Sequence, residues 1–189
     1  MAILKIARMG HPVLRQVADP VQDPTAPQVH ALIRNMIETM QDADGAGLAA
    51  PQVHVPRRVV IFHVPEERAG ETEEAAPTPL TVLINPEIEP LTEEKELGWE
   101  GCLSVPGLIG AVPRYTNIRY SGLAPDGSRI ERVAEDFHAR VVQHECDHLD
   151  GILYPQRMTD MSLLIFQEEL RHGPPEAMRE PTQEESEPV

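Results

Sequence analysis

The first strongly periodic part of the chain lies between residues 29 and 40. Apolar side chains recur there at intervals of three and four residues, at Val29, Leu32, Ile33, Met36, Ile37 and Met40. This spacing predicts one apolar stripe on an amphipathic helix, which we interpret as core packing. A capping box at Thr25-Ala-Pro-Gln28, with proline in the first turn, is the expected start of the helix, and Asp44-Gly45 is its expected end.

The middle of the chain is typical of β structure. Residues 58–63 and 80–84 are β-rich runs bounded by proline. The segment between them, 66–79, is rich in Glu, Ala, Thr and Pro, which predicts an exposed and mobile loop. Residues 117–121 and 128–133 flank Pro125-Asp-Gly127, a turn signal that predicts an antiparallel hairpin.

Two further helical segments are expected after the hairpin. One spans residues 136–149 and stops before Gly151, and a short one within 159–171 carries the apolar run 163–166. From residue 172 onward proline and glutamate dominate, which predicts a disordered acidic tail. We therefore divide the chain into a domain over 1–160, a short helical extension over 161–171 and a tail over 172–189.

These elements predict an α+β fold. A largely antiparallel sheet would pack around a central helix, the one over 136–149, with a short amphipathic helix near the N-terminus. A chain of 189 residues is long enough to bury one core of its own.

Charge and composition exclude several kinds of partner. The chain has 16 Lys and Arg against 31 Asp and Glu, so its net charge of -15 argues against direct nucleic-acid binding. No apolar run approaches the roughly 18–20 residues that cross a bilayer, and the first residues do not resemble a cleavable signal, so we expect no membrane association. Two cysteines, Cys102 and Cys146, make a poor disulfide framework, which favours the reducing cytoplasm.

Residues 144–148 read His-Glu-Cys-Asp-His, a pattern that suits a metal site. On a helix, His144 and His148 are rotated only about 40° apart, so both imidazoles can face one ion. Glu145 would then lie near a water molecule on that ion. The alternative is an exposed polar helix face. Cys146 lies about 200° and His138 about 240° round the helix from His144, so we expect neither to be a ligand.

A third ligand is harder to find from spacing alone. Downstream of the helix lie only Asp150, Asp160 and the remote His172. Upstream, Glu100-Gly-Cys-Leu-Ser104 offers a thiol in a glycine-containing segment. A Cys-His-His set would leave one open position on a four-coordinate ion, as catalytic sites do.

The segment Gly45-Ala-Gly-Leu-Ala-Ala-Pro-Gln52 is a third motif. It has no Lys-Ser/Thr after it, so it is not a phosphate loop, and its apolar residues argue against a flexible linker. Small residues ending in Gln52 suit a backbone strand that lines a cleft, with one amide able to hold an oxygen atom.

Together the three segments resemble the peptide deformylase family. That family carries G-x-G-L-A-A-x-Q, then E-G-C-L-S, then Q-H-E-x-D-H-L-x-G, and this chain matches them in order at 45–52, 100–104 and 143–151. The opening Met9-Gly-His-Pro-Val-Leu-Arg15 is also similar, so the resemblance covers residues 3–160. One departure lies near the cleft, where His54 replaces a glycine common in the family.

The resemblance implies a metal-dependent hydrolase that removes the N-formyl group from the initiator methionine of newly made polypeptides and releases formate. Cys102, His144 and His148 would hold one divalent ion, natively Fe²⁺, with Ni²⁺, Co²⁺ or Zn²⁺ as substitutes. A metal-bound hydroxide would attack, with Glu145 as general acid and base. The Gln52 amide and the Leu103 backbone N–H would stabilise the oxyanion.

The resemblance also suggests how a substrate binds. Phe137 and Val141 lie close to the His144 face of the helix, where they either line a methionine pocket or are plain core. Ala46, Gly47 and Gly101 would pair with the substrate backbone as an added strand.

Two further expectations concern the helix over 136–149 and the C-terminal end of the chain. The resemblance suggests that an ion pair of Arg114 with Asp147 fixes the helix. The expected partners are N-formylmethionyl nascent peptides, so the enzyme would act near the ribosome. Some deformylases dock on the ribosome through a basic C-terminal extension, but residues 160–189 hold eight Asp and Glu and two Arg, so we do not expect that docking here.

Two other functions share part of this pattern. A zinc endopeptidase of the H-E-x-x-H type uses the two histidines and the glutamate, but it needs neither Cys102 nor Gln52. A catalytically silent metal-binding module would retain metal without releasing formate.

Overall fold

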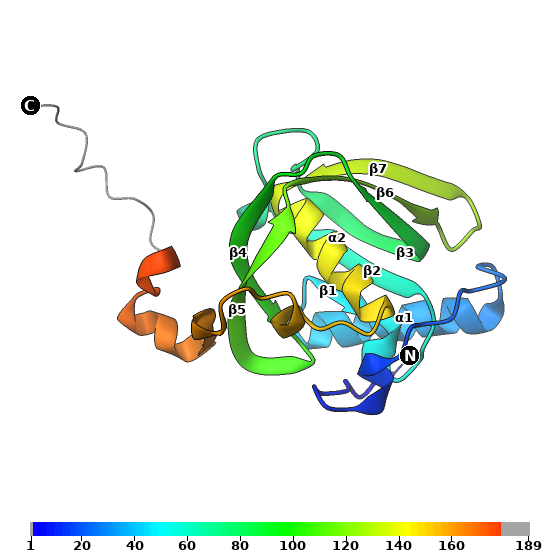
Figure 1. The fold of residues 1–189 in the computed structure, drawn as a ribbon. Coiled ribbons are helices and arrows are strands. Elements are labelled where there is room, and N and C mark those ends of the chain that lie inside the picture. The colour runs from blue at the N-terminus through cyan, green and yellow to red at the C-terminus, as the bar shows by residue number, and fades with distance from the viewer. Residues whose placement is uncertain (1, 179–189) are drawn as a thin grey trace, which may run out of the picture.

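The computed structural model describes residues 2–178, which form two antiparallel sheets and two α-helices (Figure 1). The five-stranded sheet has the order β1-β2-β3-β6-β7, and the three-stranded sheet has the order β4-β5-β8. The strands are β1 (Gly47–Ala49), β2 (Val59–Val64), β3 (Thr78–Pro90), β4 (Lys95–Cys102), β5 (Val105–Tyr115), β6 (Asn117–Leu123), β7 (Arg129–Glu135) and β8 (Leu164–Phe166). The α+β class is confirmed, with two sheets around the helix.

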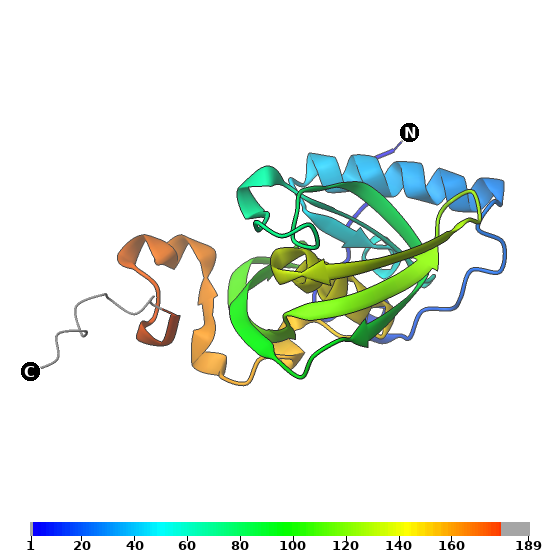
Figure 2. The same cartoon turned by 90° about the horizontal axis from the view of Figure 1, so that it is seen from above.

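The helix α2 (Asp136–Leu149) is the centre of the molecule (Figures 1 and 2). Its bounds confirm the expected ones, and Gly151 with φ 73° follows its end, in the left-handed region that favours glycine. Ala139, Val142 and Leu149 of α2 pack with Phe62 of β2 in one buried cluster. The helix is therefore covered on several sides, and a polar side chain on it must find a partner or a ligand.

The helix α1 (Pro27–Asp42) covers the opposite face of the five-stranded sheet. Successive residues of β2 point to opposite faces, so Val59 and Ile61 pack with Met36 and Met40 of α1, whereas Phe62 packs with α2. The amphipathic stripe is thus confirmed. The expected capping box is wrong, because the N-cap is Ala26, whose side chain cannot accept a hydrogen bond, with Pro27 in the first turn.

The hairpin of β6 and β7 is confirmed, but sequence periodicity did not predict the longer hairpin of β4 and β5. These two strands pair from Lys95 with Tyr115 to Cys102 with Val105. Glycines and prolines interrupt their alternation of apolar and polar residues, which hides the pattern of a strand. Only Leu103 and Ser104 connect the strands, so Cys102 lies at a tight turn.

The segment 66–79 is anchored to the body of the protein. Its residues 66–68 and 71–73 are exposed, as expected of a loop, but Ala75 is buried. The Glu135 backbone N–H donates to the Glu74 carbonyl, and the Thr72 hydroxyl donates to the Glu135 carboxylate at 3.0 Å. The last residues of the segment already belong to β3.

The expected helix within 159–171 is wrong. Residues 161–163 form a 3-10 turn, β8 pairs with β5, and residues 167–172 form a second 3-10 helix. The apolar run 163–166 has no helical alternation, and the free edge of β5 offers it hydrogen bonds that a short isolated helix cannot match. Of the expected tail, residues 179–189 lie outside the described residues, and residues 176–178 form a 3-10 turn.

Candidate active site

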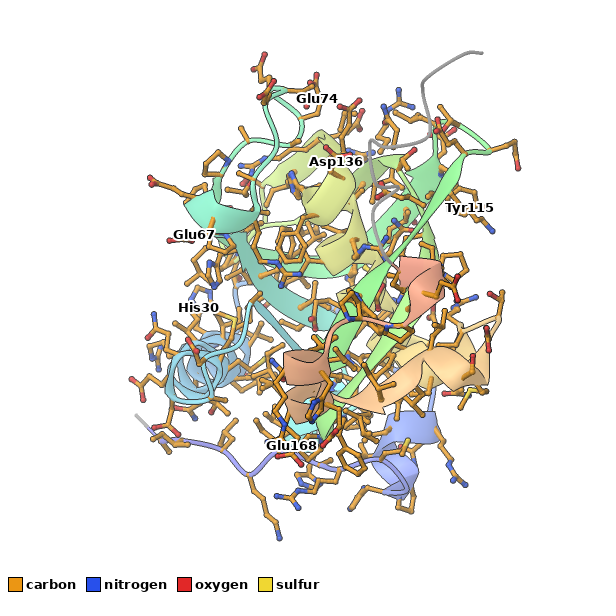
Figure 3. The ribbon with its side chains drawn as sticks, turned by 90° about the vertical axis from the view of Figure 1, so that its left-hand side faces the viewer. His30, Glu67, Glu74, Tyr115, Asp136 and Glu168 are labelled. Atoms are coloured by element: carbon orange, nitrogen blue, oxygen red, sulfur yellow. The ribbon has the colours of Figure 1, made fainter. Side chains whose placement is uncertain are left out.

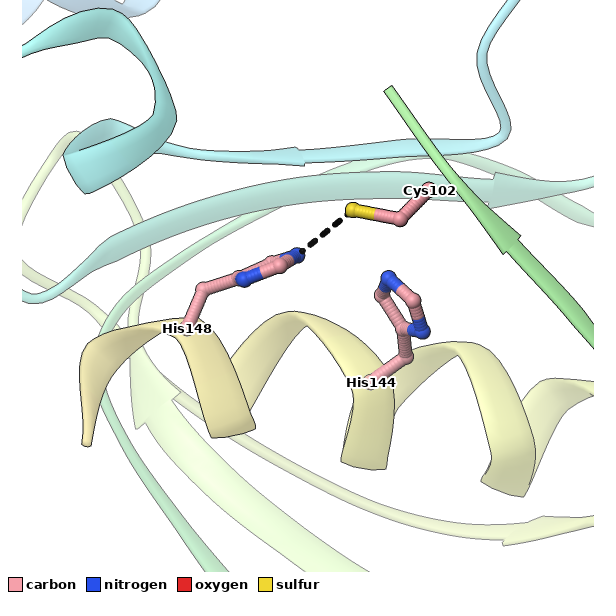
Figure 4. Close-up of side chains that lie close together, drawn as sticks. All are labelled: Cys102, His144 and His148. Atoms are coloured by element: carbon pink, nitrogen blue, oxygen red, sulfur yellow. Dashed lines mark hydrogen bonds between the residues drawn. The ribbon is translucent and has the colours of Figure 1, made fainter. Parts of the chain in front are cut away.

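Three side chains with metal-binding atoms converge between α2 and the end of β4 (Figure 4). The ligand atoms of Cys102, His144 and His148 all lie within 4.8 Å of one another, and Cys102 Sγ lies 3.4 Å from His148 Nε2. The histidines come from successive turns of α2, and the cysteine comes from the tight turn after β4. The sequence prediction that these three residues meet is realised in the geometry.

The imidazole of His144 is oriented by Glu100, a residue to which sequence reasoning gave no role. His144 Nδ1 donates to the Glu100 carboxylate at 2.8 Å, which leaves Nε2 free to face a metal ion. Burial opposes ionisation of Glu100, but hydrogen bonds from Arg114 and His144 outweigh it and hold the pKa of that carboxyl well below its usual range. The signal that could have found Glu100 is its place two residues before Cys102, on the same face of a strand.

The imidazole of His148 lies deeper than that of His144. Burial lowers the pKa of His148 well below its usual value, and the neighbouring His144 lowers it further. The neutral imidazole is the form that ligates metals. Its Nδ1 atom has no hydrogen-bond partner among residues 2–178, so packing and the Nε2 contact with Cys102 hold the ring.

Glu145 is buried beside the histidines and faces β1. Burial raises the pKa of this carboxyl to about 7, and its Oε2 atom has no hydrogen-bond partner among the residues that the structure describes. A Cβ atom at Gly47 would overlap the Glu145 carboxylate, so the glycine leaves the space that this side chain occupies. A carboxyl group with this pKa is suited to accept and return a proton near neutral pH.

The side-chain amide of Gln52 points toward Cys102 and Ser104. Its Oε1 accepts from the Ala49 backbone N–H at 2.8 Å, which directs Nε2 toward Cys102 Sγ at 3.4 Å and Ser104 Oγ at 3.1 Å. Leu103 packs with the apolar cluster that contains α1, and this contact places its backbone at the site. Gln52 is buried, so a substrate oxygen at its amide would be shielded from water.

One cleft of about 660 Å³ joins most of the predicted site residues. Ala46, Gly47 and Gln52 line one side, Gly101, Cys102 and Leu103 another, and Phe137, Val141, His144 and Glu145 of α2 lie between them. Its size is typical of a small-ligand site. His148 is not among the lining residues and lies behind them.

Two open questions about α2 are answered by these contacts. Phe137 and Val141 line the cleft and also pack with the core, so a position at the cleft and a position in the core do not exclude each other. Cys146 packs in the core on the other side of the helix, and His138 bonds to Tyr120 and to the Glu74 carbonyl. Neither belongs to the group of Cys102, His144 and His148, as expected.

The cleft also contains residues that sequence reasoning missed. They are Arg68, Trp99, Arg140, Gln167 and Leu170. Arg140 donates to Glu100 and to backbone carbonyls of β4 and β5, and the Arg68 guanidinium lies 3.8 Å from the centre of the Phe137 ring. None of them belongs to a short motif, so no local pattern marks them.

The expected ion pair of Arg114 with Asp147 is present. Arg114 donates to Asp147 and forms a two-pronged contact with Glu100 at 2.8 and 3.0 Å. Arg157 also bonds to Asp147. The buried charges thus form a network that links α2 to both strands of the β4–β5 hairpin.

Among residues 2–178, no helix combines the length and apolar character needed to cross a bilayer.

Comparisons with known proteins agree with this site. The family model of polypeptide deformylase matches residues 3–163. A peptide deformylase of Bordetella pertussis is 56% identical over 165 residues, which cover 87% of this chain and 93% of the relative. A peptide deformylase structure from Ehrlichia chaffeensis has a TM-score of 0.79 at 31% identity, over 85% of this chain and 90% of that one.

A Met-Ala-Ser-bound peptide deformylase from Acinetobacter baumannii has a TM-score of 0.75 at 38% identity, over 83% of this chain and 99% of that one. The family match covers most of the chain and includes Cys102, His144, His148, Glu145 and every lining residue of the cleft except Gln167 and Leu170. The chain therefore belongs to the peptide deformylase family, enzymes that remove the N-formyl group from newly made polypeptides.

Proposed function

We propose that this chain hydrolyses the formyl amide of N-formylmethionyl peptides in the cleft between β1 and β4, using one divalent ion held by Cys102, His144 and His148. The observation that supports this most is that Glu145 and the Gln52 amide line one cleft together with Cys102 and His144, with His148 directly behind them. Each of these side chains has a role in hydrolysis of the formyl amide.

The residues present fit a metal ion. The thiol of Cys102 and the two imidazoles place their ligand atoms within 4.8 Å of one another, close enough to bind one ion. The Glu100 contact holds His144 in the tautomer that ligates through Nε2. When bound, the ion would lower the pKa of a water molecule and polarise the formyl carbonyl. Three protein ligands suit a catalytic site, since a fourth position stays open.

Glu145 would accept a proton from the attacking water and donate it to the amine that leaves. The same carboxyl can do both, because burial sets its pKa near 7. The products are formate and a peptide with a free N-terminal methionine.

Gln52 Nε2 and the Leu103 backbone N–H would donate to the formyl oxygen as negative charge develops on it. Loss of one such donor typically slows a reaction about 10²–10³-fold. Ser104 Oγ accepts from the Gln52 amide at 3.1 Å and so helps to hold the donor in place.

The substrate would enter as an extended strand. Gly47 is the first residue of β1, the terminal strand of its sheet, and Ala46 precedes it. Both line the cleft together with Gly101 of β4, so their backbone groups can pair with a peptide between them. Phe137 and Val141 would contact the methionine side chain. A newly made polypeptide and an unpaired thiol ligand both fit the cytoplasm.

The native ion is a separate proposal. The family resemblance favours Fe²⁺, while the same ligands also suit Ni²⁺, Co²⁺ and Zn²⁺. Metal analysis of protein purified without oxygen tests this, and we expect iron as the main metal.

The decisive experiment measures formate released from formyl-Met-Ala-Ser by protein of known metal content. We expect turnover by the parent. Glu145→Ala should retain metal but lose activity by about 10²–10⁴-fold. Cys102→Ala should lose metal, and Cys146→Ala, which changes the other cysteine, should keep metal and site geometry.

Three outcomes would contradict the proposal. A folded, metallated parent that releases no formate would indicate a silent metal-binding module. Cleavage of internal bonds in a blocked peptide would favour a zinc endopeptidase. Full activity in Glu145→Ala would remove Glu145 from the proton transfers.

A further inference from the structure

The segment that follows residue 163 packs beside β5 and reaches the cleft. Strand β8 pairs antiparallel with β5, and Leu108, Ile109 and Gly110 lie opposite Phe166, Ile165 and Leu164. Leu163, just before the strand, is buried and anchors the segment at its base. We call residues 164–172 the arm. Figure 1 shows the arm, in orange, beside β5, and Figure 3 views the molecule from that side, with Glu168 on the arm labelled.

Because of its pairing register with β5, β8 directs the arm toward the open side of the cleft. Continued by one residue, it places Gln167 at the level of Gly107, where the β4–β5 hairpin borders the cleft. The chain then turns into the 3-10 helix Gln167–His172. Gln167 and Leu170 line the same cleft as Cys102, His144 and Glu145.

Leu170 differs from the arm residues around it. Its neighbours Glu168, Glu169 and Arg171 are exposed, whereas Leu170 is half-buried. An apolar side chain at the rim of a cleft remains partly in water until a ligand covers it. Gln167 beside it offers an amide that can donate to or accept from a peptide backbone.

The arm follows the part of the chain that the family model matches. The family match ends at residue 163, directly before β8. The metal ligands, Glu145 and Gln52 all precede that point, so the chemistry does not require the arm. A cleft wall that lies apart from the reacting groups is suited to adjust which substrates bind.

We propose that the arm forms the outer wall of the substrate cleft, and that Leu170 and Gln167 contact the peptide residues that follow the formylmethionine. This inference rests on the proposed deformylase function and assigns that site a determinant of peptide binding. Leu170 packs against the peptide, and Gln167 is a positioning residue for the peptide backbone.

The test compares two substrates of different length, formyl-Met amide and formyl-Met-Ala-Ser amide. For Leu170→Ala we expect KM of the longer substrate to rise about 3- to 10-fold, since the lost contact is partly exposed. The kcat for both substrates and the KM of formyl-Met amide should not change. Leu170→Met should restore KM, because methionine supplies a similar apolar surface.

Met161→Ala is the matched control, since Met161 is an exposed apolar residue just before the arm that does not line the cleft. It should leave both substrates unaffected. An equal loss on both substrates in Leu170→Ala would show a structural role and overturn the proposal, as would unchanged kinetics on both. A parent that releases no formate from either substrate would instead overturn the function on which the proposal rests.

Discussion

Gly47 on β1 lies against the Glu145 carboxylate, with no room for a side chain between them. The motif at residues 45–52 suggested a glycine that pairs with substrate backbone. The structure adds a steric requirement, because any Cβ atom at this position displaces the carboxyl group proposed to transfer protons. The absence of a side chain at Gly47 is therefore needed for Glu145 to occupy its observed position.

Gly47→Ala should therefore reduce kcat by about 100-fold or more, the contribution typical of a positioned general base. The three atoms nearest to an added Cβ all belong to Glu145 and none to Cys102, His144 or His148, so metal content should remain at the parental value. Formate kinetics and metal analysis of the same preparation check both statements. A variant that retains parental kcat would show that Glu145 can move without loss.

At the scale of elements, α2 is held to the β4–β5 hairpin by buried charges. Arg114 is 5% exposed and bonds to Glu100 of β4 and Asp147 of α2. Burial disfavours its charge, but the two carboxylates outweigh this and raise the pKa of Arg114. The contact fixes the turn of α2 between the two metal-binding histidines.

Arg114→Ala should lower the free energy of unfolding by about 3–5 kcal/mol, because it removes the buried cation that Glu100 and Asp147 share. Metal affinity should fall about 10- to 100-fold, since Glu100 loses the two hydrogen bonds from Arg114 that orient it toward His144. Chemical denaturation and metal titration measure these changes.

Arg119→Ala is the matched control for that experiment. Arg119 pairs with Glu89 at 2.9 Å on the surface, with both side chains largely exposed. Its loss should cost about 0–1 kcal/mol. Equal costs for the two variants would contradict a structural role of the buried network.

At the scale of the whole molecule, His138 joins three parts of the fold. It projects from α2, donates from Nδ1 to the Glu74 carbonyl at 3.0 Å and accepts at Nε2 from the Tyr120 hydroxyl at 3.1 Å. Phe62 of β2 and Thr78 of β3 also contact it. Burial lowers the pKa of His138, and the positive charge of Arg132 lowers it further, so the folded protein holds this ring neutral.

This arrangement predicts a loss of stability in acid. Because the folded pKa lies below the unfolded value of about 6.5, the unfolded chain binds more protons below that pH. The stabilisation is present above pH 6.5 and is lost as the pH falls toward the folded pKa. In the His138→Gln variant, the new side chain keeps a donor and an acceptor but does not titrate. The free energy of unfolding of this variant should therefore fall less between pH 7 and pH 5 than that of the parent. Denaturation of both proteins at each pH gives the difference, and a difference independent of pH would contradict the prediction.

The sequence by itself determined the elements whose pattern is local. The stripe of α1, the bounds of α2 and the β6–β7 hairpin depend on residues within a few turns of one another, where backbone hydrogen bonds link neighbours along the chain. Two histidines four apart on α2 face one point for the same reason. Cys102 and Gln52 came from motifs resembling a family, and spacing alone did not place them.

Only the tertiary structure decided the features that depend on partners far along the chain. Glu100 became the support of His144 because β4 lies beside α2, and residues 164–166 became a strand because β5 offered them a free edge. Their local sequences do not specify these partners, which lie 44 or more residues away. Hydrogen bonds and burial stabilise such pairings only after the chain has folded back on itself. The contact of Glu100 with His144 and the pairing of β8 with β5 were therefore decided by the assembled fold.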